Sequence, residues 1–368
     1  MKIEIIKTIE EFKKLELEWE RLENFEKETT IFQTFLYNYT WWETVKNLGK
    51  YELNIIIIRE DNENLLGIAP LIIETEKKLF VKIRILKFMA WGDYLGILLK
   101  TNNTNTGKII NKIFETIEKL DIDKVYLTNL DINSILGRYL KKHQVYNYLM
   151  EFQVECPQVK FSSYKSFDDF KLKFLSNSVK KQRNKMIKEI NYDFNFENNS
   201  INNRFIDIEN IHKSLKNYLN EKNNNDKRKS SYENTEKRNF LEKFYNSSKK
   251  INNFLLTNRE EIIIYDSCYI FHNRIFSWNM AHSPKYDSYN PGRVINYEIM
   301  QWGFEQNNKD LTFDFGCGGY PWKFQWTDDF TSVYKLEYNV SKNKKIKYFE
   351  KFRLIKKGII CFIKALKN

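Results

Sequence analysis

The chain has 368 residues, a formal net charge of +12 and a hydrophobic fraction of 42%. Because this length exceeds that of a typical single domain and the apolar content suffices for two cores, we expect two domains. No apolar run approaches the roughly 20 residues of a membrane-spanning helix, and the opening residues MKIEIIKTIEEF lack the pattern of a secretory signal, so we expect a cytoplasmic protein.

The cysteines and histidines predict neither a metal site nor a disulfide framework. The four cysteines have no C-x-x-C spacing, and the four histidines form no H-x-x-x-H pair. We therefore predict reduced thiols and no metal.

The first half of the chain predicts a mixed sheet with flanking helices. Alternating and β-branched residues predict paired strands over 53–59 and 65–74, a strand over 82–89, a helix over 107–120 and a strand over 124–128. A break at Cys156-Pro157 and the pair Ser162-Ser163 place the end of this domain near residues 160–164, so we predict an N-terminal domain over 1–160.

The second half repeats this order of elements in a predicted domain over 161–340. The same signals predict strands over 253–257, 262–270 and 275–281, then a helix over 292–304 and a strand over 311–315. Polar residues at 198–203 and 221–228 predict loops.

The segment from Tyr286 to Trp326 carries the strongest sign of a binding site. Asn290-Pro291-Gly292 opens the predicted helix, and a helix N-terminus with free backbone N–H groups and a partial positive charge can hold a phosphate. After the strand, a glycine turn at 316–319 leads to Tyr320, Trp322, Lys323 and Trp326, which place a cation among aromatic rings. The alternative is a helix and strand joined to an ordinary glycine turn.

The last residues, 341–368, predict a basic amphipathic helix. From residue 344 onward eight lysines and one arginine against one glutamate account for +8 of the net charge of +12. Such a helix can lie on an anionic membrane surface or pack on the domain with a solvated basic face, and no spacing separates these alternatives.

A second basic cluster lies between Lys171 and Lys188. Nucleic-acid binding is one interpretation, but most such runs are solvated faces, and the rest of the chain is only mildly basic. We therefore expect no nucleic-acid partner and assign this helix to an anionic substrate.

Several short blocks occur in the order of a known family. They are Trp41-Trp42, the strand Leu66–Leu71, the element Trp91–Tyr94, the basic helix 174–184, and a final block of Tyr289, Pro291, Gly292, Asp314, Gly316 and residues 323–326. Jointly, over roughly residues 15–340, they resemble GNAT-like acyltransferases of the cellulose-biosynthesis acetyltransferase family, a branch similar to the Fem-type transferases. Trp322 stands where the family pattern has a tyrosine. The resemblance implies an α/β fold of tandem GNAT-like domains, each a mixed β-sheet flanked by helices.

The resemblance also implies the substrates and the site. An acyl-CoA, with acetyl-CoA as first candidate, would bind at Tyr289, Asn290, Pro291, Gly292 and Arg293. The catalytic candidates are Asp314, Lys323, Asp93 and Tyr94, and the acceptor would contact Trp91, Lys180, Arg183, Tyr320 and Trp322. Asp314 would orient or deprotonate the acceptor, and Lys323 would pair with Asp314 or with an anionic acceptor. Structural roles are the alternative: capping of the glycine turn for Asp314, and core packing for Trp91 and Tyr94.

The expected function is acyl-CoA-dependent N- or O-acyl transfer to a sugar or amine acceptor in cell-surface polysaccharide or glycoconjugate biosynthesis, in the cytoplasm or at the inner face of the membrane. One alternative is a Fem-like transferase that uses aminoacyl-tRNA. Against it, residues 198–250 lack the sustained heptads of a long helical arm, although some Fem relatives have no such arm. Another alternative is a non-catalytic, membrane-associated binding protein.

Overall fold

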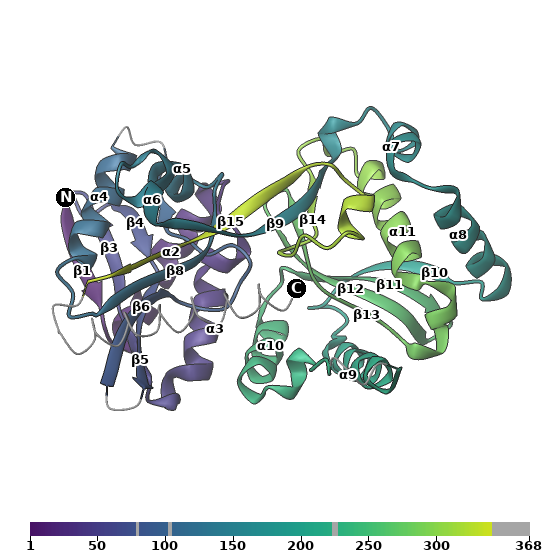
Figure 1. Cartoon of the computed structure of the whole chain (residues 1–368), viewed down its shortest axis with the longest axis horizontal. Coiled ribbons are helices and arrows are strands. Elements are labelled where there is room, and N and C mark those ends of the chain that lie inside the picture. The colour runs from purple at the N-terminus through teal and green to yellow at the C-terminus, as the bar shows by residue number, and fades with distance from the viewer. Residues whose placement is uncertain (79–80, 102–104, 223–226, 341–368) are drawn as a thin grey trace, which may run out of the picture. The chain divides into compact units, whose positions relative to one another are not determined.

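The computed structural model describes residues 1–78, 81–101, 105–222 and 227–340, shown in Figure 1. The predicted C-terminal helix over 341–368 lies outside the described residues. The chain forms two compact units: the first contains Met1–Thr29, Val45–Gln153 and residues 334–340, and the second contains Thr30–Thr44 and Val154–Val333. Compared with the predicted domains 1–160 and 161–340, each unit therefore includes a segment from the other half of the chain.

The first unit contains two sheets. One has the order β1-β3-β4-β7, formed by β1 (Lys2–Ile6), β3 (Ile55–Arg59), β4 (Leu65–Ala69) and β7 (Leu98–Leu99). The other runs from the end of β15 (Phe330–Asn339) through β8 (Lys124–Asp131), β6 (Val81–Phe88) and β5 (Leu71–Lys78) to β2 (Tyr51–Leu53), and its β6 and β8 are parallel. The helices are α1 (Ile9–Lys14), α2 (Glu16–Phe25), α4 (Thr106–Ile117), α5 (Ile135–Lys142) and α6 (Tyr146–Leu149).

Pro70 divides the strand predicted over 65–74. The first part, β4, pairs with β3 as predicted, whereas the second part, β5, pairs with β2 and β6 in the other sheet. A proline has no N–H for the strand ladder, so it stands where the chain leaves one sheet for the next.

The second unit contains one mixed sheet with the order β10-β11-β12-β13-β14-β9. Its strands are β10 (Asp193–Asn198), β11 (Ile251–Asn258), β12 (Glu261–Phe271), β13 (Arg274–His282), β14 (Thr312–Asp314) and the later part of β9 (Met150–Lys160). Only the pair of β13 and β14 is parallel among these neighbours. Its helices are α3 (Phe35–Val45, without its last residue), α7 (Phe167–Phe174), α8 (Asn177–Glu189), α9 (Phe205–Lys222), α10 (Thr235–Ser247) and α11 (Pro291–Glu305).

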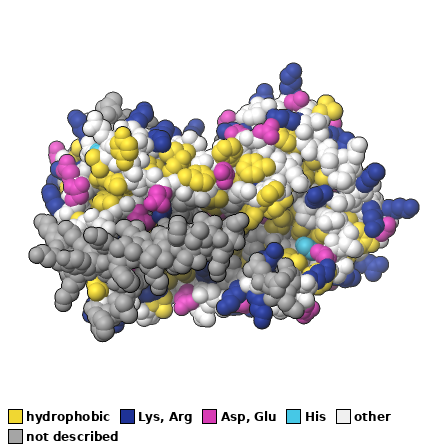
Figure 2. Space-filling model, in the orientation of Figure 1, with side chains coloured by type: hydrophobic (Ala, Val, Ile, Leu, Met, Phe, Trp, Pro, Cys, Tyr) yellow, Lys and Arg dark blue, Asp and Glu magenta, His cyan; other side chains and the backbone are white. Residues whose placement is uncertain are grey.

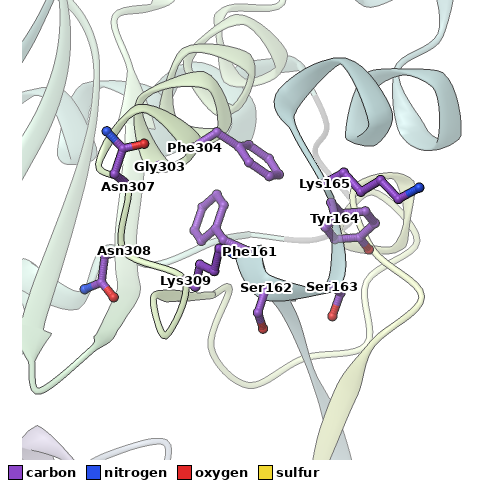
Figure 3. A pocket seen from close by; sticks show the side chains of 10 residues that line it. All are labelled: Phe161, Ser162, Ser163, Tyr164, Lys165, Gly303, Phe304, Asn307, Asn308 and Lys309. Carbon is purple, nitrogen blue, oxygen red and sulfur yellow. The ribbon is translucent and has the colours of Figure 1, made fainter.

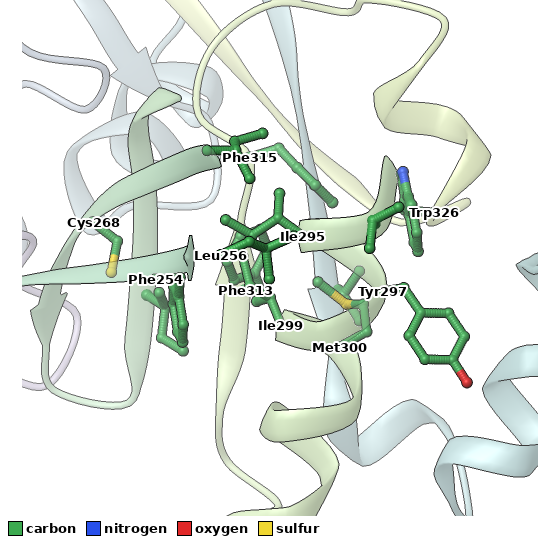
Figure 4. Close-up of a cluster of buried hydrophobic side chains, with 14 of the residues drawn as sticks. Phe254, Leu256, Cys268, Ile295, Tyr297, Ile299, Met300, Phe313, Phe315 and Trp326 are labelled. Atoms are coloured by element: carbon green, nitrogen blue, oxygen red, sulfur yellow. The ribbon is translucent and has the colours of Figure 1, made fainter. Parts of the chain in front are cut away.

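Helices cover both faces of this sheet because its central strand is apolar on both sides. Ile264 and Cys268 of β12 belong to the core under α11, whereas the ring of Tyr269 packs edge-on against Phe244 of α10, 5.6 Å between centroids. Figure 4 shows Ile295 and Ile299 of α11 within the first of these cores. The buried apolar residues of α11 recur at spacings of three to five positions, so they form one apolar stripe that packs on the sheet.

The predicted elements of the second half are present, with small differences at their ends. The strand predicted over 311–315 is limited to Thr312–Asp314, and Cys156 and Pro157 lie inside β9 instead of in a break between domains. Pro157 is accommodated because its carbonyl still accepts a bond from the N–H of Phe315, at 3.0 Å.

Near the C-terminal end of α11, Gly303 allows the ring of Phe161 to pack against the helix (Figure 3). A Cβ at Gly303 would lie 2.2 Å from Cζ of Phe161. Although alanine normally stabilises a helix interior by about 1 kcal/mol relative to glycine, we expect Gly303→Ala to lower the free energy of unfolding by about 1–3 kcal/mol through overpacking. Urea denaturation measures this change.

Gly292→Ala is the matched control, because a Cβ there has its nearest neighbour at 3.9 Å, the Cε of Met280. We expect it to be neutral or slightly stabilising. If both variants unfold at the same urea concentration, the Phe161 ring relaxes into the neighbouring hollow of about 350 Å³ and the packing argument is wrong.

Candidate active site

A pocket of about 410 Å³ lies at the N-terminal end of α11. Four segments of the second unit line it: the end of β13 with Met280 and His282, the turn that contains Asp287, the first turns of α11 from Asn290 to Asn296, and the segment 322–326 with Trp322 and Trp326. Four predicted donor-binding residues and the predicted substrate residue Trp322 therefore share one pocket.

The N-terminus of α11 is open to a ligand. Asn290 adopts a left-handed conformation with φ of 51°, Pro291 occupies the first turn, and no side chain caps the helix. A side chain at Gly292 would meet only the Cε of Met280, at 3.9 Å, and the guanidinium of Arg293 has no ion-pair partner among the described residues. The N–H of Arg293 donates to the carbonyl of Asn290 at 3.0 Å, so the groups that suit a phosphate are the N–H of Gly292, the positive helix end and the guanidinium of Arg293.

Tyr289 lies just outside this pocket and contacts α8 instead. Its hydroxyl donates to Glu189, 3.1 Å away, and Lys185 lies 4.8 Å from the centre of its ring. These contacts attach the chain before α11 to the basic helix.

Strands β13 and β14 separate beside this pocket. Their pairing ends at Phe276 and Asp314, whereas β13 stays paired with β12 as far as His282. One edge of residues 277–282 is therefore left without its neighbour β14. At 3.3 Å per residue, this edge extends about 17 Å from the point of separation to the pocket.

A buried carboxylate that the sequence analysis missed lies at the point of separation. Asp266 of β12 is only 1% exposed, and the hydroxyl of Ser277 lies 2.8 Å from each of its carboxylate oxygens. Burial raises the pKa of Asp266 to about 7, although the Ser277 bond and the positive charge of Lys323 act in the opposite direction. The signal in the sequence was an acidic residue inside the apolar strand EIIIYDSCYIF.

Asp314 and Lys323 both hold the glycine turn at 316–319. The oxygens of the fully buried Asp314 accept bonds of 2.8 Å from the Gln158 amide and from the N–H of Gly316. The ammonium of Lys323 donates to the carbonyls of Gly316 and Cys317, at 2.9 and 3.1 Å. The contacts of the capping alternative are thus present, and the catalytic roles of both residues stay predictions.

His282 forms a polar pair at the edge of the pocket. Its Nε2 lies 3.1 Å from Asp287, whose other oxygen accepts bonds from Tyr218 and Lys222. Burial lowers the pKa of His282, and the Asp287 carboxylate only partly offsets this effect, so the imidazole is neutral near pH 7. His282 was not among the predicted site residues.

The remaining predicted substrate residues of this unit lie apart from the pocket lining. Arg183 of α8 forms an ion pair with Glu298 of α11 at 2.6 Å and stacks over Tyr297, so it joins two helices. Lys180 is exposed on α8, and Tyr320 is 59% exposed beside the glycine turn.

Trp91, Asp93 and Tyr94 belong to the first unit, between β6 and β7. Tyr94 is 1% exposed, as core packing requires, whereas Trp91 and Asp93 are half-buried. All lining residues of the pocket at α11 come from the second unit.

Comparison with known families gives the chemistry of this unit. Residues 215–324 match the model of the acetyltransferase (GNAT) domain, a range that contains β11 to β14, α11 and Lys323. The chain is an acyltransferase. The GNAT part of the predicted resemblance is confirmed, and membership of the cellulose-biosynthesis branch stays a prediction. A search of curated protein sequences found none that matches this acyltransferase.

Solved structures with the same fold cover nearly the whole chain. FemX is similar with a TM-score of 0.58 at 12% identity, over 95% of this chain and 99% of that one. A conserved protein of unknown function from Bacteroides thetaiotaomicron has a TM-score of 0.52 at 10% identity, over 91% and 99%. The C-terminal domain of a putative lysylphosphatidylglycerol synthetase from Agrobacterium fabrum has a TM-score of 0.51 at 7% identity, over 90% and 92%. The predicted fold class is confirmed.

Within the described part of the acyltransferase, no cluster of three or more His, Cys, Asp or Glu residues is arranged to hold a metal ion. No helix of that part is long and apolar enough to cross a membrane.

Asp266 predicts a specific dependence of stability on pH. Its pKa is about 7 in the folded protein against an ordinary 3.8, so between these values the folded state holds a proton that the unfolded chain has released. Raising the pH from about 4 to about 7 therefore lowers the free energy of unfolding, and this contribution is constant above that window. Asp266→Asn should remove the slope and gain on the order of 4 kcal/mol over wild type between these limits.

Urea denaturation of both proteins at several pH values tests this prediction. Ser277→Ala, which keeps the carboxylate but removes its hydrogen bond, is the control and should retain the slope. Parallel pH profiles for wild type and Asp266→Asn would show that Asp266 titrates near its ordinary pKa.

Proposed function

We propose that this acyltransferase uses an acyl-CoA, with acetyl-CoA as first candidate, to acylate an amine or hydroxyl of a sugar or amine acceptor in cell-surface polysaccharide or glycoconjugate biosynthesis. The observation that supports an acyl-CoA donor is the N-terminus of α11. No side chain caps it, and it opens into the pocket lined by Gly292 and Arg293. The acceptor class and pathway come from the family resemblance.

The donor would extend from α11 to the separation of β13 and β14. Its phosphates would lie at the backbone N–H of Gly292 and at Arg293, where the guanidinium is the available group because the Arg293 N–H donates to the Asn290 carbonyl. The amide-containing arm of coenzyme A would follow the unpaired edge of residues 277–282, where backbone groups can bond to its amides. This course would bring the thioester close to Ser277 and Lys323.

In the reaction, the acceptor nitrogen or oxygen attacks the thioester carbonyl, loses its proton, and displaces coenzyme A as a thiolate that is then protonated. Asp314 and Lys323 remain our candidates for orienting the acceptor and balancing negative charge. Asp266, with a pKa of about 7, is a further candidate proton acceptor. Its hydrogen bond with the Ser277 hydroxyl links it to the point where β13 and β14 separate. Tyr320, Trp322, Lys180 and Arg183 remain our candidates for contacts with the acceptor.

Location and partners follow the sequence prediction. We propose a cytoplasmic protein whose basic residues 341–368 bring it to the anionic inner face of the membrane. On the face shown in Figure 2, Lys and Arg side chains are interspersed with Asp and Glu, which supports the proposal that nucleic acid is not a partner.

The second candidate is a Fem-like transferase with an aminoacyl-tRNA donor, and the similarity of fold to FemX favours it. This second candidate function uses a different donor from the first, so a measurement of donor binding distinguishes the two functions.

Gly292→Glu tests the donor site. A carboxylate at this helix end would repel the donor's phosphates, and we expect the affinity for acetyl-CoA to fall roughly tenfold or more. Isothermal titration calorimetry of wild type, Gly292→Glu and the uncharged control Gly292→Ala measures this effect. Equal affinity in all three proteins would place the donor elsewhere, and a folded wild type that binds aminoacyl-tRNA but not acetyl-CoA would support the second candidate.

Lys323→Met and Asp314→Asn test the proposed chemistry. We expect each to slow release of coenzyme A thiol about tenfold to a hundredfold in the presence of amino-sugar acceptors, with acetyl-CoA affinity changed by no more than about twofold. Lys323→Arg, which keeps the charge, should recover part of the rate. A wild type that binds the donor but transfers to no acceptor would support the non-catalytic alternative.

A further inference from the structure

We propose that Cys156 and Cys317 form a redox modification site, at which a peroxide converts the two thiols into a disulfide that links the glycine turn to β9. The two sulfur atoms lie 3.3 Å apart, although 161 positions separate the residues in the sequence. This site goes beyond the proposed acyl transfer and does not depend on it.

The backbone already holds the two cysteines opposite each other. The N–H of Phe315 donates to the carbonyl of Pro157 and the N–H of Gly318 donates to that of Glu155, both at 3.0 Å, so the bonds lie on either side of the cysteines. Between these two bonds Gly316 and Cys317 lie opposite Cys156, so the backbone brings the two thiols together.

The glycine turn has the freedom to close the remaining gap. A disulfide requires sulfur atoms about 2.05 Å apart, so Cys317 has to move about 1.3 Å toward β9. Gly316 and Gly318, with φ of 70° and 118°, flank Cys317 and lack the side chains that restrict such backbone. Cys156 is fully buried on a strand and provides the fixed side of the pair.

The exposure of the two thiols sets the order of the reaction. Cys317 is partly exposed, whereas Cys156 is buried, so hydrogen peroxide first oxidises the Cys317 thiol to a sulfenic acid and releases water. The Cys156 sulfur then attacks the Cys317 sulfur, and the sulfenic oxygen leaves as a second water. Two thiols and one peroxide thus give one disulfide and two waters, and an added dithiol reverses the bond.

This bond would fix a wall of the candidate active site. The carbonyls of Gly316 and Cys317 hold the ammonium of Lys323, and Trp322 in the pocket lining packs edge-on against Phe315 at 5.8 Å. Cross-linking the turn therefore restricts the segment that carries both side chains.

Cys268 provides an internal control. It is fully buried, its thiol donates to the carbonyl of Asn252 at 3.3 Å, and burial raises its pKa, so it should resist oxidation. Cys361 lies outside the described residues and is replaced by serine in every protein used in the test.

The experiment treats the purified full chain with hydrogen peroxide, alkylates the remaining thiols and maps the peptides by mass spectrometry. We expect one intramolecular Cys156–Cys317 link, a free Cys268, full recovery with dithiothreitol, and a melting temperature about 5–10 °C above that of the reduced protein. Hydrogen exchange of residues 315–323 should slow on oxidation.

Cys317→Ser and Cys156→Ala should each abolish the link and both physical changes, and the partly exposed position of Cys317 makes its variant the safer one for folding. Stable sulfinic acid at Cys317 without a link, a link to Cys268, or unchanged thiols would overturn the proposal. Acetyl-CoA titration of the reduced protein is run alongside, so a failure of the donor hypothesis is seen separately from a failure of the disulfide.

Discussion

The short parallel pairing of β13 and β14 is the constraint on which the candidate site depends. Two parallel neighbours require the chain to return to the same end of the sheet, and here α11 makes that return. The start of α11 must then lie near the end of β13, which places the positive end of the helix beside His282. Because β14 ends after three paired residues, the rest of β13 keeps an open edge that leads to the same helix end.

The buried polar groups near the point where β13 and β14 separate stabilise one another. A buried carboxylate is costly unless hydrogen bonds or opposite charges compensate, and Asp266 receives Ser277 and the field of Lys323. Asp314 receives Gln158 and the N–H of Gly316. Lys323 therefore serves two purposes, since its charge acts on Asp266 while its protons bind the turn that Asp314 caps. Such a cluster lowers stability compared with an apolar core, and it lies beside the open edge of β13.

The sequence was sufficient to predict the local elements but not the contacts between distant ones. Pro291 and Gly292 predicted the helix start because their effects are local, and the apolar periodicity predicted the strands around it. The effect of Pro70 was not predicted, since the sequence does not show that the strands before and after a proline belong to different sheets. Segment 30–44 packs in the second unit, and Cys156 meets Cys317 across 161 positions. Both depend on tertiary packing, which no short-range pattern encodes.

Asp266 and Asp314 differ in their readiness to take a proton from an acceptor. Both oxygens of Asp314 already accept bonds that hold the turn, so proton transfer to it would disturb the backbone of Gly316. Among the described residues, Asp266 accepts its side-chain hydrogen bonds from the Ser277 hydroxyl, which can reverse its direction of donation when the carboxylate is protonated. With a pKa near neutrality, Asp266 can exchange a proton through Ser277 without moving the chain. Within the proposed reaction, we therefore propose that Asp314 positions the turn and that Asp266 exchanges the proton.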